Sequence, residues 1–232
     1  MRTMRDFELP PQKERVRAKA VRFEWITIAY LVSAVVLVYL TLGASQAMKA
    51  VWLEDLLSLV PPMAFLIGDR VRRKPPDKEF PFGHHAAISI AYFAAAMALA
   101  GLGLFIFYDS FMKFISFEHA PIGVVQPFGE PVWLGWFMLG ALLWSAVPAV
   151  ILGRIKISIA RELHDKVLYA DAEMNKADWM TAVAGMVGVI GIGLGIWWLD
   201  AAAAIFISLD IMKDGFTNVR IAVHDLSDGR PR

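Results

Sequence analysis

Six apolar runs follow one another along the chain, and they constrain its fold more than any other feature. They lie at about residues 25–43, 51–68, 86–112, 132–152, 168–198 and 199–212 of the 232-residue sequence. A membrane-spanning helix needs about 20 apolar residues, so six such helices use about 120 residues and leave only loops and tails. The sequence therefore predicts an all-α, polytopic membrane protein with six transmembrane helices and no large soluble domain beside them.

The sixth run is the weakest of the series. Ala201–Leu209 is apolar, but Asp210 then interrupts it. About 12 residues of helix rise only about 18 Å, so this run can cross the membrane only if the helix continues through Phe216–Ile221 with Asp210 turned away from lipid. We expect the fifth and sixth spans to join in a tight hairpin at Trp198–Asp200, with Asp200 as the helix N-cap.

Lysine and arginine residues predict the orientation of the spans. A charged N-terminal tail at 1–22 precedes the predicted transmembrane domain at 23–214, and a short tail at 215–232 follows it. With both tails inside, 21 of the 23 Lys and Arg residues lie on the cytoplasmic side, and only Lys49 and Lys113 lie outside. Positive residues collect on the cytoplasmic side, and the charged start is not a cleavable signal peptide. We therefore expect a multi-pass protein of a bacterial-type inner (plasma) membrane with both termini in the cytoplasm.

The composition excludes several classes of function. A formal net charge of +1 provides no basic field for nucleic acid. The chain contains no Cys, which excludes disulfides, thiolate metal sites and cysteine nucleophiles. The sequence shows no nucleophile elbow, phosphate-binding loop or zinc-protease motif. We therefore expect a protein that is not an enzyme and that carries no bound cofactor.

Two carboxylates lie deep in the predicted membrane helices. Counted from the cytoplasmic ends of their helices at about 1.5 Å per residue, Asp55 lies about 20 Å into the membrane and Asp178 about 15–18 Å. Charged groups inside a membrane usually face a protein interior or a water-filled path. Two carboxylates at matched depth, on the second and fifth spans, could bind a divalent cation or exchange it for protons. Asp55 and Asp178 are therefore the main metal-ligating candidates.

Three residues near this pair are weaker candidates. Asp171 and Met174 share one face of the fifth span with Asp178, at spacings of i, i+3 and i+7. Asp171 is also close enough to the inner surface to be an ordinary interfacial residue. Glu54 could likewise reach the outer interface, so both acids have an alternative without a metal.

Proline and glycine predict where helices bend and where they approach each other. Pro61-Pro62 removes backbone hydrogen-bond donors and predicts a kink just inside Asp55, which either accompanies an ion path or is purely structural. The fifth span carries Gly185 and Gly188 among other small residues, which favours close contact with Ala201–Ala204 of the sixth span.

The histidines do not converge on the carboxylate pair. His84, His85 and His164, with Asp165, fall in the predicted inner loops. They could form a second, cytoplasmic metal site, and the alternative is that they are solvated loop residues.

Two stretches of the sequence resemble the cation diffusion facilitator (cation efflux) family. Residues 72–84 read Arg-Arg-Lys-Pro-Pro-Asp-Lys-Glu-Phe-Pro-Phe-Gly-His and resemble the loop after that family's second span. Residues 170–178 read Ala-Asp-Ala-Glu-Met-Asn-Lys-Ala-Asp and resemble its fifth-span pattern. The start of the sixth span at Asp200-Ala201 also fits. The resemblance covers about residues 20–226 and implies a cation-efflux-transporter-like bundle of six helices.

The resemblance also implies a transport site with two ligands on the second span and two on the fifth. Asp55 matches the first of these positions and Asp178 the last, whereas Leu59 and Met174 stand at the other two. Leu cannot bind a metal and Met is a soft, weak ligand, so the family's usual four-ligand zinc site is not intact. Four nearby side chains could complete a different shell, with waters: Asp171, Glu54, Ser58 or Asn175.

By the same resemblance, the chain is expected to be a homodimer that exports a divalent metal ion, such as Zn, Mn, Fe, Co or Cd, from the cytoplasm in exchange for protons. Most family members carry a cytoplasmic regulatory domain after the sixth span, and 18 residues follow Asp214 here, so we expect this domain to be absent. The rival hypothesis is a non-transporting membrane scaffold or partner protein that kept the fold. Leu59 and Met174 favour this rival, whereas the two retained acids argue against it because buried charges are costly.

Overall fold

The predicted all-α bundle of six long helical segments is confirmed. The computed structural model describes residues 11–72, 85–118, 121–126, 129–163 and 166–226, with the backbone alone for some helical residues. The helices of this part of the chain are α1 (Pro11–Thr41), α2 (Gln46–Leu57), α3 (Val60–Arg72), α4 (His85–Ile115), α5 (Leu134–Leu163), α6 (Lys166–Gly193) and α7 (Trp198–Leu226). Together α2 and α3 form one broken segment, which corresponds to the second predicted span.

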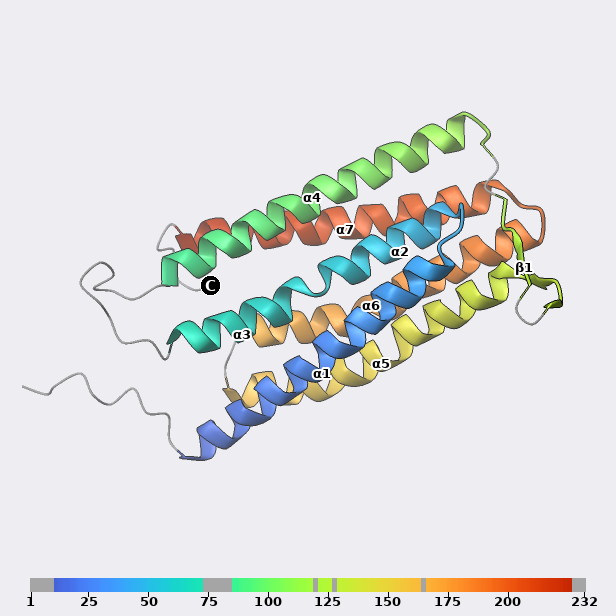
Figure 1. Cartoon of the computed structure of the whole chain (residues 1–232). Helices are drawn as coiled ribbons and strands as arrows, with labels where there is room; N and C mark the ends of the chain where they lie inside the picture. The colour runs from blue at the N-terminus through green and yellow to red at the C-terminus, as the bar shows by residue number, and fades with distance from the viewer. Residues whose placement is uncertain (1–10, 73–84, 119–120, 127–128, 164–165, 227–232) are drawn as a thin grey trace, which may run out of the picture.

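The segments run alongside one another between two ends of the bundle (Figure 1). The N-terminal end holds the starts of α1, α4 and α6 and the last residues of α3, α5 and α7. The opposite end holds the connections α1–α2, α4–α5 and α6–α7. Helix α4 packs mainly against α7, α5 packs against α6, and α1 packs against α5. Pro11 and Leu226, the two limits of the described chain, therefore lie at the same end.

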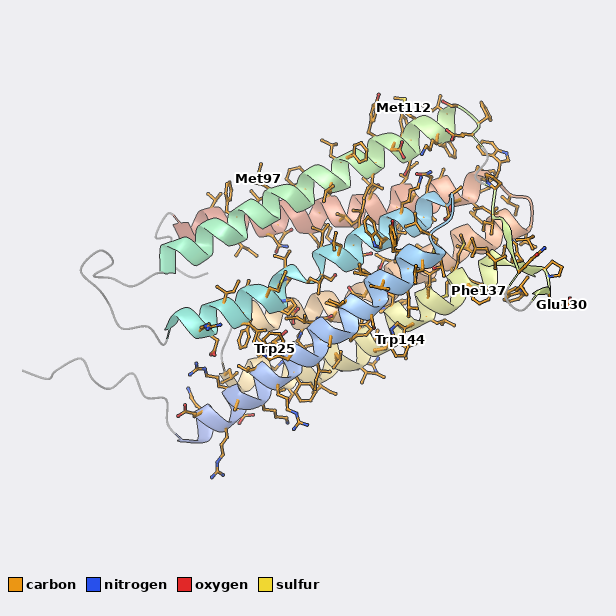
Figure 2. All side chains as sticks on the ribbon, viewed as in Figure 1. Trp25, Met97, Met112, Glu130, Phe137 and Trp144 are labelled. Atoms are coloured by element: carbon orange, nitrogen blue, oxygen red, sulfur yellow. The ribbon has the colours of Figure 1, made fainter. Side chains whose placement is uncertain are left out.

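Apolar side chains cover much of the outside of the bundle. Trp25 on α1 is 61% exposed and Trp136 on α5 is 66% exposed. Figure 2 shows Met97 and Met112 projecting outward from α4 and Trp144 from α5. Such an exterior is unfavourable in water and suits the hydrocarbon of a bilayer. Among the described residues, three stretches are by length and apolarity sufficient to cross a membrane: 13–41, 46–70 and 134–163.

A short antiparallel β-ribbon lies at the opposite end of the bundle. Among the described residues, it is the only β-structure. Strands β1 (Val124–Val125) and β2 (Val132–Trp133) pair with Val124 opposite Trp133. Glu130 lies on the loop that connects them (Figure 2). The ribbon leads directly into α5 and thereby shortens the irregular part of the longest connection at this end.

The second segment is broken at the predicted kink. Pro61 and Pro62 have no backbone N–H, so two carbonyl groups one turn earlier in the chain lose their helical partners. Helix α2 accordingly ends at Leu57, Ser58 forms its C-cap, and α3 begins at Val60. The break lies within one turn of Asp55, on the side of the N-terminal end.

The turn between α6 and α7 corrects one prediction. We expected the hairpin at Trp198–Asp200, but the turn occupies residues 194–197. Gly195 has a φ of +78° there, a left-handed conformation that glycine adopts without strain. Helix α7 therefore starts earlier, Asp200 lies inside its first turn, and the helix continues to Leu226. That continuation is what the sequence required of a sixth span.

Asp200 caps α2 rather than its own helix. Its carboxylate accepts hydrogen bonds from the Ser45 hydroxyl (2.5 Å) and from the backbone N–H groups of Gln46 (2.6 Å) and Ala47 (3.2 Å). Ser45 is the N-cap of α2, and its oxygen accepts from the N–H of Met48 at 3.1 Å. A negative charge is favourable at a helix N-terminus, and Asp200 lies at the N-termini of both α2 and α7. This contact joins the second and sixth segments at the opposite end.

Two glycines allow close contacts between helices. A Cβ atom on Gly188 of α6 would lie 2.9 Å from the Cβ of Ala47 and 3.2 Å from that of Ala203. A Cβ atom on Gly215 of α7 would lie 2.7 Å from the backbone of Ala100 on α4. The predicted contact between α6 and α7 is therefore present at Gly188, and the same glycine also meets α2.

We predict that Asp200→Ala lowers the free energy of unfolding by about 2–4 kcal/mol, because it removes a helix cap and leaves buried N–H groups without acceptors. Reversible unfolding in detergent, followed by circular dichroism, measures this change. Asp210→Ala on the same helix is the matched control, since its side chain is partly exposed and lies 3.8 Å from an exposed Lys213. Equal stability of the two variants would contradict the capping role.

Candidate functional site

Asp55 on α2 is buried, with one carboxylate oxygen bonded and the other without a partner. The residue is 5% exposed, and its Oδ1 accepts a hydrogen bond from Ser145 Oγ of α5 at 2.7 Å. The carbonyl of Ser145 in turn accepts a hydrogen bond from the Tyr30 hydroxyl of α1. Oδ2 of Asp55 is buried and has no hydrogen-bond partner among the residues that the structure describes. A buried oxygen in this state suits a cation or a proton, because buried acceptors normally have a partner.

Asp178 on α6 belongs to the same buried region. The residue is 9% exposed, and its carboxylate lies in electrostatic range of Asp55. Tyr30 lies in electrostatic range of both carboxylates, and so does Glu54, the residue before Asp55. Acids from the second and fifth segments therefore lie within electrostatic range of each other inside the bundle.

A second group of buried charges lies nearer the N-terminal end. Lys156 of α5 is fully buried, and its Nζ lies 3.0 Å from Glu24 Oε2 and 3.3 Å from Thr27 Oγ1, both on α1. The same ammonium forms an ion pair with Asp171 of α6. Glu24 and Asp171 are 0% and 1% exposed. We call Glu24, Thr27, Lys156 and Asp171 the Lys156 cluster; a single cation there links carboxylates from two other helices.

The weaker sequence candidates are divided between these two groups. Asp171 lies in the Lys156 cluster, and Asn175 donates hydrogen bonds to its carbonyl (2.9 Å) and to its Oδ1 (3.1 Å). Ser58 is buried at the break between α2 and α3. The remaining candidates lie outside the described residues or have side chains that are not described: Met174, His84, His85, His164 and Asp165.

No group of three or more His, Asp and Glu side chains in the described part of the chain is arranged to hold a metal ion. Asp55 and Asp178 would need further oxygen ligands to complete a cation site. Water and the carbonyl groups freed at the break between α2 and α3 are suitable, since discontinuous membrane helices use such carbonyls to coordinate ions.

Sequence reasoning missed Glu24 and Lys156. Lys156 follows the apolar run at 132–152, so it was counted with the positive residues of an inner loop, but α5 continues well beyond it. A signal was available, because Leu152, Ile159 and Ala160 lie at i−4, i+3 and i+4 from Lys156 and are all buried. These spacings put Lys156 on the buried face of an extended helix.

Comparison with protein families assigns this fold. The chain matches the model of the cation efflux transmembrane domain over residues 23–227. The chain belongs to the cation efflux family. The match contains α2 to α7 entirely and most of α1. The resemblance seen in the sequence is therefore confirmed, and the bundle is the multi-pass membrane domain of this family.

Several curated relatives of the family are similar to this chain along most of its length. The manganese efflux system protein MneS of Bacillus subtilis is 28% identical over 202 residues, which cover 87% of this chain and 66% of MneS. The manganese efflux system protein MneP of the same organism is 24% identical over 193 residues, covering 80% and 61%. The cation-efflux pump FieF of Yersinia pestis is 27% identical over 189 residues, covering 79% and 57%. The matched part of this chain thus corresponds to less than two thirds of each relative.

We predict that Lys156→Met lowers the free energy of unfolding by about 3–5 kcal/mol, because it leaves two buried carboxylates without their cation. Unfolding of the purified protein in detergent measures the effect. Lys213→Met is the matched control, since the Lys213 side chain is 76% exposed and its pair with Asp210 spans 3.8 Å, and such exposed pairs contribute at most about 1 kcal/mol. A Lys156→Met variant as stable as this control would show that the cluster does not hold the helices together.

Proposed function

We propose that the chain is a secondary transporter that exports a divalent metal cation from the cytoplasm in exchange for protons, with Asp55 and Asp178 binding the ion. The observation that carries the proposal is the burial of these two carboxylates, from α2 and α6, in electrostatic range of each other. Acids in a membrane bundle are costly to keep and mark ion pathways. Membership of the cation efflux family supports the same reading.

The proposed ligands favour a cation that is readily coordinated by oxygen atoms. Asp55 and Asp178 provide carboxylates, and the break after α2 provides carbonyl groups. Oxygen ligands of this kind suit Mn²⁺ well, whereas Zn²⁺ and Cd²⁺ are often bound by softer nitrogen and sulfur ligands. Leu59 and Met174 stand where the family's usual zinc site has ligands, which also weighs against zinc. The two relatives named as manganese efflux proteins point the same way, so Mn²⁺ is the first substrate to test.

Proton exchange follows from the chemistry of the proposed ligands. A carboxylate must be deprotonated to bind a metal ion, so cation binding and proton release at Asp55 and Asp178 are linked. Alternating exposure of one such site to the two sides of a membrane would carry metal one way and protons the other. Because metal ion and protons would use the same carboxylates, this exchange requires no second path for the protons.

The orientation and the assembly are part of the proposal. Most Lys and Arg residues of the described chain lie toward the N-terminal end of the bundle, which supports an inner (plasma) membrane location with this end and both termini in the cytoplasm. The ion would then load from the N-terminal end and leave at the opposite end. We propose a homodimer from the family relationship.

The second candidate function is a non-transporting membrane scaffold or partner protein. Leu59 and Met174 favour it, and so does the lack of a group of three His, Asp or Glu side chains among the described residues. The two candidates differ in whether purified protein moves any divalent ion across a sealed membrane.

We predict that proteoliposomes containing the purified protein show Mn²⁺ uptake coupled to proton flux. Asp55→Asn and Asp178→Asn should each reduce the rate about tenfold or more, because a loss of about 1.4 kcal/mol in ion-binding free energy already produces that change. Stopped-flow measurement with a metal indicator and a pH indicator gives both fluxes, with Zn²⁺, Fe²⁺, Co²⁺, Cd²⁺ and Mg²⁺ tested alongside.

Asp109→Asn is the matched control for this experiment. Asp109 lies near the opposite end of α4, and its Oδ2 lies 2.9 Å from Lys113 Nζ, away from the proposed site. This variant should transport at the wild-type rate. Absence of flux for every ion would favour the scaffold, and equal rates for Asp178→Asn and wild type would disprove the proposed site.

A further inference from the structure

The Lys156 cluster forms a polar layer between two apolar ones. On the side of the N-terminal end, Ala20, Phe65, Ile159, Ala160 and Leu168 form a buried apolar cluster from α1, α3, α5 and α6. On the other side, a second apolar cluster is formed by Tyr30, Leu31, Ala34, Ala149 and Leu152 of α1 and α5. Glu24 and Lys156 fall between the two clusters along both helices. The layer is therefore enclosed by protein on both sides.

The layer also lies between Asp178 and the N-terminal end. Asp171 precedes Asp178 by seven residues on α6, which is about 10 Å along the helix axis. Lys156 follows Ser145, the partner of Asp55, by eleven residues on α5, or about 16 Å. A cation that approaches Asp55 and Asp178 from the N-terminal end along α5 and α6 must pass the level of this cluster.

The cluster joins the helices that would have to separate for such a passage. Its ammonium is fixed by Glu24 of α1 and Asp171 of α6 while its own side chain belongs to α5. Nearer the N-terminal end, Arg17 of α1 forms an ion pair with Asp69 of α3. Helix α1 is thus tied by charge to α3, α5 and α6 in this half of the bundle.

The charges of the cluster determine how it can open. Enclosed in protein, the Lys156 ammonium is shared by two carboxylates, and separating it from them without solvent would be very costly. Separation becomes less costly when water reaches the charges and replaces the lost partners. Separation of α1, α5 and α6 at the Lys156 cluster is therefore coupled to the entry of water.

We propose that the Lys156 cluster is a latch that closes the ion site toward the N-terminal end and parts to admit the cation. Lys156, Glu24 and Asp171 are positioning residues in this role, and Asp171 acts through Lys156 instead of binding the metal. The latch rests on the proposed function, because it assigns control of access to the site formed by Asp55 and Asp178.

Site-specific thiol labelling tests the latch, and the absence of natural Cys makes it clean. Ser145→Cys places a small reporter at the ion site, where residue 145 is 3% exposed. The latch is removed without leaving an unpaired charge by the triple substitution Glu24→Gln, Lys156→Met and Asp171→Asn. In membrane vesicles with the N-terminal end facing the medium, a membrane-impermeant methanethiosulfonate should modify the reporter about tenfold faster or more when the latch is removed. An unchanged rate would overturn the proposal.

A second reporter separates a latch from a general loss of packing. Ser110→Cys lies near the opposite end of α4 and is fully buried, so its labelling should not change when the latch is removed. Equal acceleration at both reporters would mean that the cluster stabilises the whole fold, and it would also overturn the latch. Labelling requires no transport. Selective acceleration of labelling in a protein without metal flux would therefore support the latch and contradict the proposed function. Metal flux without acceleration would support the proposed function and contradict the latch.

Discussion

The cost of placing a charge in an apolar medium organises this structure. At the opposite end, the buried Asp200 carboxylate accepts hydrogen bonds from the first residues of α2. Lys156 is fully buried because Glu24 and Asp171 surround it from two other helices. Each of these contacts joins segments that are distant in sequence. These charged groups therefore link α7 to α2, and α5 to α1 and α6, within a bundle whose buried clusters are otherwise apolar.

The polar groups change in character along the bundle axis. From the N-terminal end inward, an apolar cluster is followed by the Lys156 cluster, then by the second apolar cluster on α1 and α5, and then by Asp55 and Asp178, where the second segment is broken. Beyond them lies the largest apolar cluster, which includes Met48, Leu142 and Ile207. The two carboxylates of the Lys156 cluster share an ammonium group, whereas Asp55 has a buried oxygen with no hydrogen-bond partner among the described residues. This contrast is why the ion is assigned to the level of Asp55 and Asp178.

The sequence predicted the features that depend on distance along one helix. Run length predicted the six segments, counting from helix ends brought Asp55 and Asp178 to one level, and Pro61-Pro62 predicted the break. Features that depend on a partner from another segment were missed or misplaced. Asp200 has the residue type of an N-cap, but only the fold shows that it caps α2. Apolar residues at helical spacings around Lys156 indicate a buried face, but a buried lysine becomes reasonable only when Glu24 and Asp171 are known to face it.

Binding of Mn²⁺ to the purified protein tests the role of Asp55 and Asp178 as ligands, because it requires neither a gradient nor a particular orientation. Electron paramagnetic resonance of Mn²⁺ titrated into the protein in detergent distinguishes free from bound ion. The account predicts a saturable site in the wild-type chain that is lost in Asp55→Asn and in Asp178→Asn and kept in Asp109→Asn. Saturable binding that survives both of the first two substitutions would contradict it.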